Sequence, residues 1–137
     1  MSTLFRNYKY LGWFPVVTWC GLIFWMSGKS ETPDPGIWLP PHFDKIVHAV
    51  IYAILSSFMY AFLRSCGIPP VKSAVLSVLF SSLYGITDEW RQSMVDNRVA
   101  DIYDWIADTV GACIVFIHVK YEATLKLPFT GKNETHT

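Results

Sequence analysis

The sequence predicts an all-α membrane protein in which four transmembrane helices form an antiparallel bundle, and three observations support this fold class. Hydrophobic residues make up 52% of the 137 residues and charged residues only 16%, whereas soluble domains carry roughly 25% charged residues. The mean hydropathy is +0.29. The apolar residues also gather in stretches that approach the roughly 20 residues with which a helix crosses a bilayer. Such a composition excludes a disordered chain, a nucleic-acid-binding tail and a disulfide-stapled secreted mini-protein.

The first span is expected over about residues 10–26, after a short cytoplasmic N-terminus. It falls within the 19 uncharged residues that separate Lys9 from Lys29. No small-x-small cleavage site follows its apolar core, so we interpret it as an uncleaved anchor and not as a signal peptide. The proline-rich segment from Ser27 to Pro41 is expected to end this helix as a loop.

The second span is expected over about residues 44–63, which include the 18 uncharged residues between Lys45 and Arg64. Gly67 and the pair Pro69–Pro70 follow it closely. Glycine is the usual residue after a helix end, and proline favours the first position of the next helix. These residues therefore predict a tight connection between two antiparallel helices.

The third and fourth spans, at about residues 73–90 and 102–120, are expected to be short and to have acidic outer ends. Their uncharged stretches hold only 15 and 11 residues, or about 22 Å and about 16 Å of helix against a hydrocarbon core of about 30 Å. Asp108, together with Asp104, must then enter the membrane zone for the fourth helix to cross. Acids at such depth usually face a bundle interior or a wet cavity. The alternative is a locally thinned bilayer with both acids at the head groups.

The lysine and arginine counts predict that both termini lie in the cytoplasm. With this orientation seven of the 11 lysines and arginines lie inside and four outside, whereas nine of the 11 acids lie outside. The expected organisation is a multi-pass protein with a cytoplasmic N-terminus at residues 1–9, one four-helix domain at residues 10–127 and a polar tail at residues 128–137.

Polar residues recur at helical spacing at the outer ends of the last three spans, which predicts a polar pocket on the extracytoplasmic side. On the second span, for example, Asp44, His48 and Tyr52 are four residues apart and share one helix face. The residues expected to line the pocket are Asp44, Lys45, His48 and Tyr52 from the second span, Asp88, Glu89 and Gln92 from the third, Arg98 from the following loop, and Asp104 and Asp108 from the fourth.

These residues by themselves leave several kinds of site open. In a structural network, the acids would be neutralised by Lys45, Arg91 and Arg98 and would fix how the helices pack. In a metal site, His48 with the carboxylates would suit a hard divalent cation such as Mg²⁺ or Ca²⁺ better than zinc. A cation-dependent enzyme is disfavoured, because the cysteines are scattered and read as free thiols, and no Gly-x-Ser-x-Gly segment exists.

The preferred function is the binding of an envelope lipid head group. Lys45, Arg91 and Arg98 are expected where the outer leaflet carries its phosphates, and arginine binds phosphate through two hydrogen bonds. The neighbouring acids favour a zwitterionic or amine-bearing head group, or a phosphate bridged by a cation. No nucleic-acid partner is indicated.

The alternative function is that of a non-catalytic accessory or scaffolding subunit of a larger membrane complex. The chain contains six tryptophans, seven tyrosines and nine phenylalanines. Aromatic side chains anchor protein interfaces, but they also form the belts at membrane surfaces. Other membrane protein subunits are therefore possible partners beside membrane lipids.

The pocket residues also carry a resemblance to a known family. The segment from Asp44 to Tyr52 resembles the Asp-Lys-x-x-His-x-x-x-Tyr motif of the VanZ-like family of small membrane proteins, and the segment from Asp88 to Gln92 resembles its Asp-Glu-x-x-Gln motif. The residues that continue the family's spacing after these two motifs are Arg98, Asp104, Asp108 and Gly111. The resemblance covers about residues 10–117.

This resemblance implies an integral protein of the bacterial inner (cytoplasmic) membrane. The founding member of the family is associated with low-level resistance to the glycopeptide teicoplanin, and the family has no settled mechanism. The chain departs from the family pattern at Asp108, where asparagine is more frequent, and at Asn97, where glycine is common. An additional acid at Asp108 could change a hydrogen-bonding role into a titrating or cation-binding one, which weakens the transfer of any family function to this chain.

Overall fold

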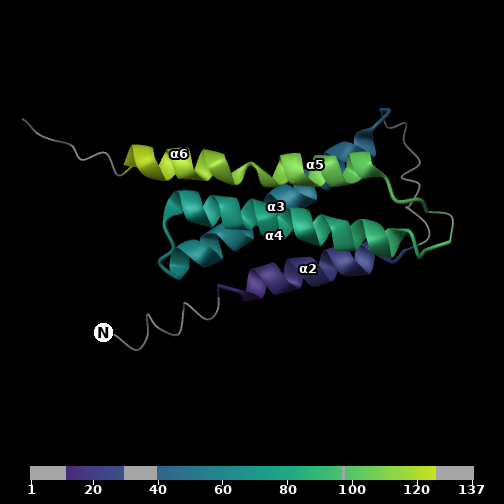
Figure 1. The fold of residues 1–137 in the computed structure, drawn as a ribbon, viewed down its shortest axis with the longest axis horizontal. Coiled ribbons are helices and arrows are strands. Elements are labelled where there is room, and N and C mark those ends of the chain that lie inside the picture. Colours follow the sequence, from purple (N-terminus) through teal and green to yellow (C-terminus); the bar gives the residue numbers. More distant parts are fainter. Residues whose placement is uncertain (1–11, 30–39, 97, 126–137) are drawn as a thin grey trace, which may run out of the picture.

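The structure is a computed structural model that describes residues 12–29, 40–96 and 98–125. Within these ranges the chain consists of helices and short turns, without a β-strand, which confirms the all-α class. The helices lie side by side along one common direction (Figure 1). Three helices of the described residues are long and apolar enough to cross a membrane: Phe43–Ser65, Pro70–Gln92 and Ile102–Thr124.

Helix α2 (Phe14–Ser27) is shorter, and two hydrogen bonds attach it to its neighbours. The indole nitrogen of Trp19 donates to the carbonyl of Ile51 at 2.9 Å. The hydroxyl of Tyr84 donates to the carbonyl of Cys20 at 2.7 Å. The expected start of this span at residue 10 lies outside the described residues, as do the flanking residues 1–9, most of the proline-rich loop and the tail at 128–137.

Helix α3 (Phe43–Ser65) begins directly after His42, which has a left-handed backbone with a φ of 64°. At its other end Gly67 adopts a φ of 85°, a conformation that glycine reaches without a steric penalty. The amide of Ile68 donates back to the carbonyl of Leu63 at 3.1 Å, and Pro70 opens the next helix. The observed connection is thus the tight turn that the glycine and the proline pair predict.

Helix α4 (Pro70–Gln92) packs through a stripe of small residues. Ser73, Ser77 and Ser81 are fully buried, and buried Gly85 continues the same spacing of four. Small side chains let helix backbones approach one another closely in a membrane. The next turn of the same face carries the buried residues Asp88, Glu89 and Gln92. The buried face of α4 therefore consists of small residues that are followed, toward the end of the helix, by polar residues.

The last apolar segment consists of α5 (Ile102–Ala112) and α6 (Val115–Leu125), separated by a turn at residues 113–114. Asp101 caps α5, since its side chain accepts a hydrogen bond from the amide of Tyr103 at 2.9 Å. The indole nitrogen of Trp105 donates to the carbonyl of Ser82 at 3.0 Å and holds α5 against α4.

The third and fourth spans were expected to be short because their uncharged stretches are short, but the helices observed there are as long as α3. The segments Pro70–Gln92 and Ile102–Thr124 each have 23 residues, as many as α3, or about 34 Å at 1.5 Å per residue. They reach this length because Asp88, Asp104 and Asp108 are part of the helices. Hydrogen bonds and ion pairs within the protein, described below, allow these acids to be helical and buried.

Large apolar side chains cover much of the outer surface of these helices. Leu83, Trp90, Val110 and Ile117 are all more than 60% exposed. A water-soluble monomer rarely leaves so many contiguous apolar side chains in contact with water. The surface is that of a protein surrounded by lipid.

Candidate functional site

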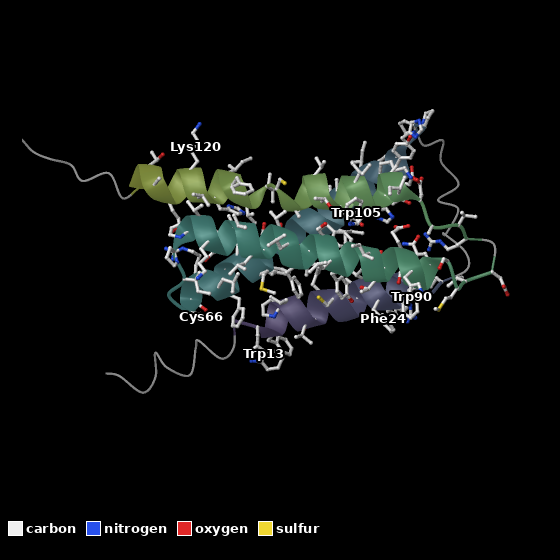
Figure 2. The ribbon with its side chains drawn as sticks, in the orientation of Figure 1. Trp13, Phe24, Cys66, Trp90, Trp105 and Lys120 are labelled. Atoms are coloured by element: carbon white, nitrogen blue, oxygen red, sulfur yellow. The ribbon has the colours of Figure 1, made fainter. Side chains whose placement is uncertain are left out.

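A buried polar cluster joins α3, α4 and α5 near the start of α3. Oxygen and nitrogen atoms are seen between the helices toward the end that carries Trp90 (Figure 2). We call this group the acidic cluster. Its members are Lys45, His48 and Tyr52 from α3, Asp88, Glu89 and Gln92 from α4, and Asp104 and Asp108 from α5. The helical spacing in the sequence and the packing of three helices thus bring eight of the ten predicted pocket residues together.

Lys45 ties the start of α3 to the start of α5. Its ammonium nitrogen lies 2.5 Å from Asp101 Oδ2 and 2.5 Å from Asp104 Oδ1. The Lys45 hydrogen bond lowers the pKa of the Asp101 carboxyl, and the Tyr103 amide lowers it further. Lys45 is consequently occupied by carboxylates and is not free to bind an external phosphate.

Asp44 and Arg98 lie outside the acidic cluster. The Asp44 side chain is 59% exposed and is 3.0 Å from the Lys45 nitrogen. Its position in the first turn of α3 keeps it at the surface, and the longer Lys45 side chain makes the contact with α5. Arg98 is half-buried in the loop before α5 and donates to the carbonyl of Lys29 at 3.4 Å.

His48 and Asp108 form the central pair of the acidic cluster. His48 Nδ1 lies 2.9 Å from Asp108 Oδ1, and Asp108 is fully buried. When the Asp108 carboxylate is ionised it can only accept, and the Nδ1–H of the imidazole then donates to it. His48 Nε2 is 3.9 Å from Asp104 Oδ2.

Two glycines create the space for this pair. A Cβ on Gly111 would overlap the backbone carbonyl of Ala49, so the missing side chain lets α5 touch the backbone of α3. A Cβ on Gly85 would lie 3.0 Å from Asp108 Oδ2. Asp108 is therefore enclosed by α3 on one side and α4 on the other.

The two acids of α4 are each held at one oxygen. Glu89 Oε2 accepts from the backbone amide of Asp101 at 2.8 Å, and Asp88 Oδ2 accepts from Gln92 Nε2 at 3.2 Å. The hydroxyl of Ser27, at the end of α2, faces the Asp88 carboxyl but donates to the carbonyl of Phe24 at 3.3 Å. These bonds hold one oxygen of each carboxylate.

Four buried polar atoms of the acidic cluster have no hydrogen-bond partner among the described residues. They are Tyr52 Oη, Asp88 Oδ1, Glu89 Oε1 and Asp108 Oδ2. A buried polar atom without a partner costs about 1–3 kcal/mol. Three of the four belong to carboxylates, which accept hydrogen bonds or bind cations. The cluster therefore has unused capacity for a proton donor or a positive charge.

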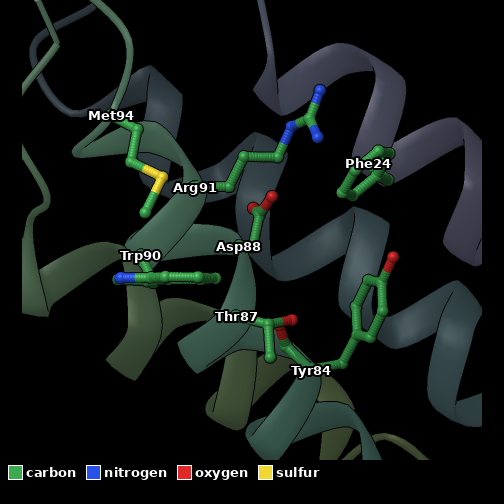
Figure 3. Close-up of a pocket in the computed structure, with 7 residues that line it drawn as sticks. All are labelled: Phe24, Tyr84, Thr87, Asp88, Trp90, Arg91 and Met94. Atoms are coloured by element: carbon green, nitrogen blue, oxygen red, sulfur yellow. The ribbon is translucent and has the colours of Figure 1, made fainter.

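A groove between α2 and α4 reaches the acidic cluster through Asp88. We call it the α2–α4 groove, and its volume is about 400 Å³. Figure 3 shows Arg91 and Asp88 at its centre, with Phe24 and Tyr84 on one side and Trp90 and Met94 on the other. The lining residues are Phe24, Tyr84, Thr87, Asp88, Trp90, Arg91 and Met94. The groove thus combines an apolar wall with one acid and one arginine.

Arg91 is placed to bind an anion in this groove. Its guanidinium carbon lies 3.4 Å from the centre of the Phe24 ring, a cation–π contact that holds the side chain in place. Its Nε is buried and lacks a hydrogen-bond partner within the described ranges. Over the same residues, neither Arg91 nor Arg98 comes within 4 Å of a carboxylate. Among the described residues, neither guanidinium is therefore neutralised by an ion pair.

The chemistry of the acidic cluster favours binding over nucleophilic catalysis. The His48 ring contacts carboxylates, and no serine or cysteine of the described chain hydrogen-bonds to it. A Ser-His or Cys-His nucleophile needs such a bond. One ring nitrogen of His48 and one oxygen each of Asp88 and Glu89 do lie within 4.8 Å of one another, a separation that a metal ion could bridge.

A second polar cluster at the other end of α3 was not predicted from the sequence. We call it the Arg64 cluster; it comprises Ser57, Tyr60, Arg64, His118 and Glu122, beside a second groove of about 380 Å³. Arg64 binds both oxygens of Glu122 at 2.8–3.2 Å, and the Tyr60 hydroxyl donates to Glu122 at 2.8 Å. Arg64 and Glu122 are 58 residues apart in the chain, so no local pattern indicates the pair.

Comparison with known protein families agrees with the motifs in the acidic cluster. The sequence model of the VanZ/LLP1 family matches residues 5–121 and thus most of the chain. The chain belongs to the VanZ/LLP1 family. Together with the apolar helices, this membership identifies a VanZ-like membrane protein. No curated protein and no solved structure matches the chain significantly.

In this VanZ-like protein, the sequence motifs indicate most of the acidic cluster but miss what supports it. Asp101 lies on the acidic stripe of α5, yet its backbone contact with Glu89 and its ion pair with Lys45 arise only from the fold. Arg91 lies inside the second motif, and its stacking on Phe24 depends on the position of α2. The small-residue spacing from Ser73 to Gly85 was a sequence signal that could have revealed the packing face of α4.

Proposed function

We propose that this VanZ-like protein binds a phosphate-bearing envelope lipid head group in the α2–α4 groove, with a positive charge held by the acidic cluster behind it. The observation that carries the proposal is that Asp88 lines the apolar groove beside Arg91 and also belongs to the acidic cluster. Three carboxylate oxygens of that cluster are buried without a hydrogen-bond partner among the described residues. Arg91 lines the groove and supplies one cationic side chain for the phosphate. Arg98, which interacts electrostatically with Asp88 from the loop before α5, supplies a second. The positive charge is either an amine of the head group or a cation that bridges to its phosphate.

The apolar wall of the α2–α4 groove suits the remainder of a lipid. Trp90 is 65% exposed and Phe24 is 55% exposed, so the groove is continuous with the outer apolar surface. A lipid could enter sideways from the bilayer while its head group stays at the polar end. The proposal includes a four-pass antiparallel topology in the inner membrane, with both termini cytoplasmic and the acidic cluster on the extracytoplasmic side.

Native mass spectrometry of protein extracted gently from its own membrane tests this function. We expect retained phospholipid on the wild-type chain and at least a tenfold loss of retention in Arg91→Ala and in Arg98→Ala. Lys72→Ala is the matched control, because it removes an exposed cation from the opposite end of α4. Equal lipid retention in all four proteins would refute the proposal, and stoichiometric protein partners without lipid would favour the scaffolding function.

The association with teicoplanin that the family resemblance implies belongs to the same proposal. A protein that handles an envelope lipid on the outer face could alter how a glycopeptide reaches its target. Cells that express the wild-type protein should show a small rise in teicoplanin tolerance, and cells that express Arg91→Ala should not. Equal tolerance of both strains at equal protein levels would show that the Arg91 side chain has no role in teicoplanin tolerance.

A further inference from the structure

We propose that His48, Asp88 and Glu89 bind one hard divalent cation of the Mg²⁺ and Mn²⁺ class. The three residues each offer a ligand atom, and these atoms lie within 4.8 Å of one another. With ligands at about 2.1 Å from an octahedral metal, opposite ligands are about 4.2 Å apart and adjacent ligands about 3.0 Å apart. Side-chain shifts of about 1 Å would therefore complete the coordination.

The unpartnered atoms point to a ligand independently of this spacing. Tyr52 is 1% exposed and Asp108 is 0% exposed. Neither Tyr52 Oη nor Asp108 Oδ2 has a hydrogen-bond partner in the part of the chain that is described. The Tyr52 hydroxyl interacts electrostatically with Asp88, Glu89 and Asp108, so it lies near these three acids. Water molecules on a bound ion could donate to both atoms.

The Asp108 carboxylate orients the proposed histidine ligand. Metal-binding histidines commonly donate their other ring N–H to a carboxylate, which fixes the ring and raises its basicity. His48 makes this bond to Asp108 at 2.9 Å. Asp108 thus acts as a positioning residue, and the acid that distinguishes this chain from the common family pattern has a defined role.

The charge balance also favours a dication. Asp88, Glu89, Asp104 and Asp108 are all less than 9% exposed. Among the described residues, the side chains that form ion pairs with these four acids are Lys45 and, when protonated, His48. A divalent ion would neutralise the two carboxylates of α4, which Lys45 does not reach within 4 Å.

The number of ligands distinguishes Mg²⁺ and Mn²⁺ from Ca²⁺. Calcium takes six to eight oxygen ligands, whereas magnesium is typically held by one or two carboxylates and completes its shell with water and phosphate. Manganese shares this preference for oxygen and accepts an imidazole. The cation site does not depend on lipid binding. If the proposed function holds, an ion at Asp88 is the positive charge that bridges to the phosphate of the head group.

Mn²⁺ binding to the purified protein in nanodiscs of zwitterionic phospholipid, after removal of metal with EDTA, tests the site. Electron paramagnetic resonance of free Mn²⁺ should show one ion bound per chain, and Mg²⁺ should displace it more readily than Ca²⁺. Affinity should fall at least tenfold in Asp88→Asn and in Glu89→Gln. Asp96→Asn should bind as the wild type does, because Asp96 is an exposed acid in the loop after α4.

A spectroscopic readout on the wild-type protein keeps the test independent of variants that fail to fold. Bound Mn²⁺ should show the hyperfine coupling of one imidazole nitrogen, and His48→Gln should abolish it. Absence of stoichiometric binding, or bound Mn²⁺ without nitrogen coupling, would overturn the inference. Lipid retention measured in EDTA then judges the proposed function separately, since a lipid can be retained by the arginines when no ion binds.

Discussion

At one end of α3, Arg64 and Glu122 satisfy each other. At the other end, Tyr52 and the acids near His48 hold four buried atoms without a hydrogen-bond partner among the described residues. Both clusters connect α3 to the last apolar segment of the chain, and both lie beside a groove. The Arg64 cluster has a guanidinium matched to one carboxylate. The acidic cluster has more acids than its cations balance. The first arrangement is that of an internal clamp, and the second leaves capacity for the ligands that we propose.

The largest expected effect comes from separating the helices on which both clusters depend. Gly111→Ala would drive a methyl group into the Ala49 backbone, which cannot move as a side chain can. We expect a loss of about 3 kcal/mol in the free energy of unfolding, the upper part of the range for overpacking. Denaturant titration in detergent, followed by circular dichroism, measures it.

Gly21→Ala is the matched control for this substitution. Gly21 also lies in a helix, but a Cβ there meets nothing within 4 Å. Alanine favours helix over glycine by up to about 1 kcal/mol. The control should therefore be neutral or slightly more stable, and an equal loss in both variants would remove the special role of Gly111.

The second effect tests whether the Arg64 cluster is a structural clamp. Arg64→Ala leaves the Glu122 carboxylate without its bidentate partner, so we expect the unfolding midpoint to fall. The fall should exceed that of Tyr60→Phe, which removes one hydrogen bond to the same carboxylate, worth about 1 kcal/mol. Equal midpoints for Arg64→Ala and the wild-type protein would show that the pair is not a clamp.

The third prediction makes the same substitution, glutamate to glutamine, in both clusters and expects opposite changes in stability. Glu89→Gln removes a buried charge that lacks a cation, so in EDTA the variant should be about 1 kcal/mol more stable than the wild-type protein. Glu122→Gln removes a charge that Arg64 neutralises, so it should destabilise. Thermal unfolding of both variants, with and without Mn²⁺, provides the comparison.

Added Mn²⁺ should raise the unfolding temperature of the wild-type protein and of Glu122→Gln, because a ligand that binds only the folded state stabilises it. It should leave Glu89→Gln unchanged. A destabilised Glu89→Gln in EDTA would contradict the view that the acidic cluster carries uncompensated charge.

The smallest effect concerns pH at the edge of the acidic cluster. The hydrogen bond from Lys45 lowers the pKa of Asp101 below its ordinary value of 3.8. Its contribution to stability is therefore present above that ordinary value and is lost as the pH falls through the lowered pKa. Asp101→Asn should weaken the loss of stability below about pH 4, and an unchanged acid profile would mean that the Lys45 contact does not act on folding.

The sequence by itself determined the helical class, the approximate location of the apolar helices and the polar residue types that gather at one end. Composition decides the first two, because a helix is the simple way to satisfy backbone hydrogen bonds among apolar surroundings. Helical spacing decides the third, because residues such as Asp88 and Gln92 necessarily share a face of α4.

Only the tertiary structure decided which of these polar residues satisfy one another. The distance between helix axes depends on Gly85 and Gly111, and it sets whether His48 reaches Asp108. The choice of Lys45 over Asp44 for the contact with α5, and the pairing of Arg64 with Glu122, likewise depend on helix rotation and register. These quantities are set by packing between segments distant in sequence, so periodicity within one segment cannot supply them.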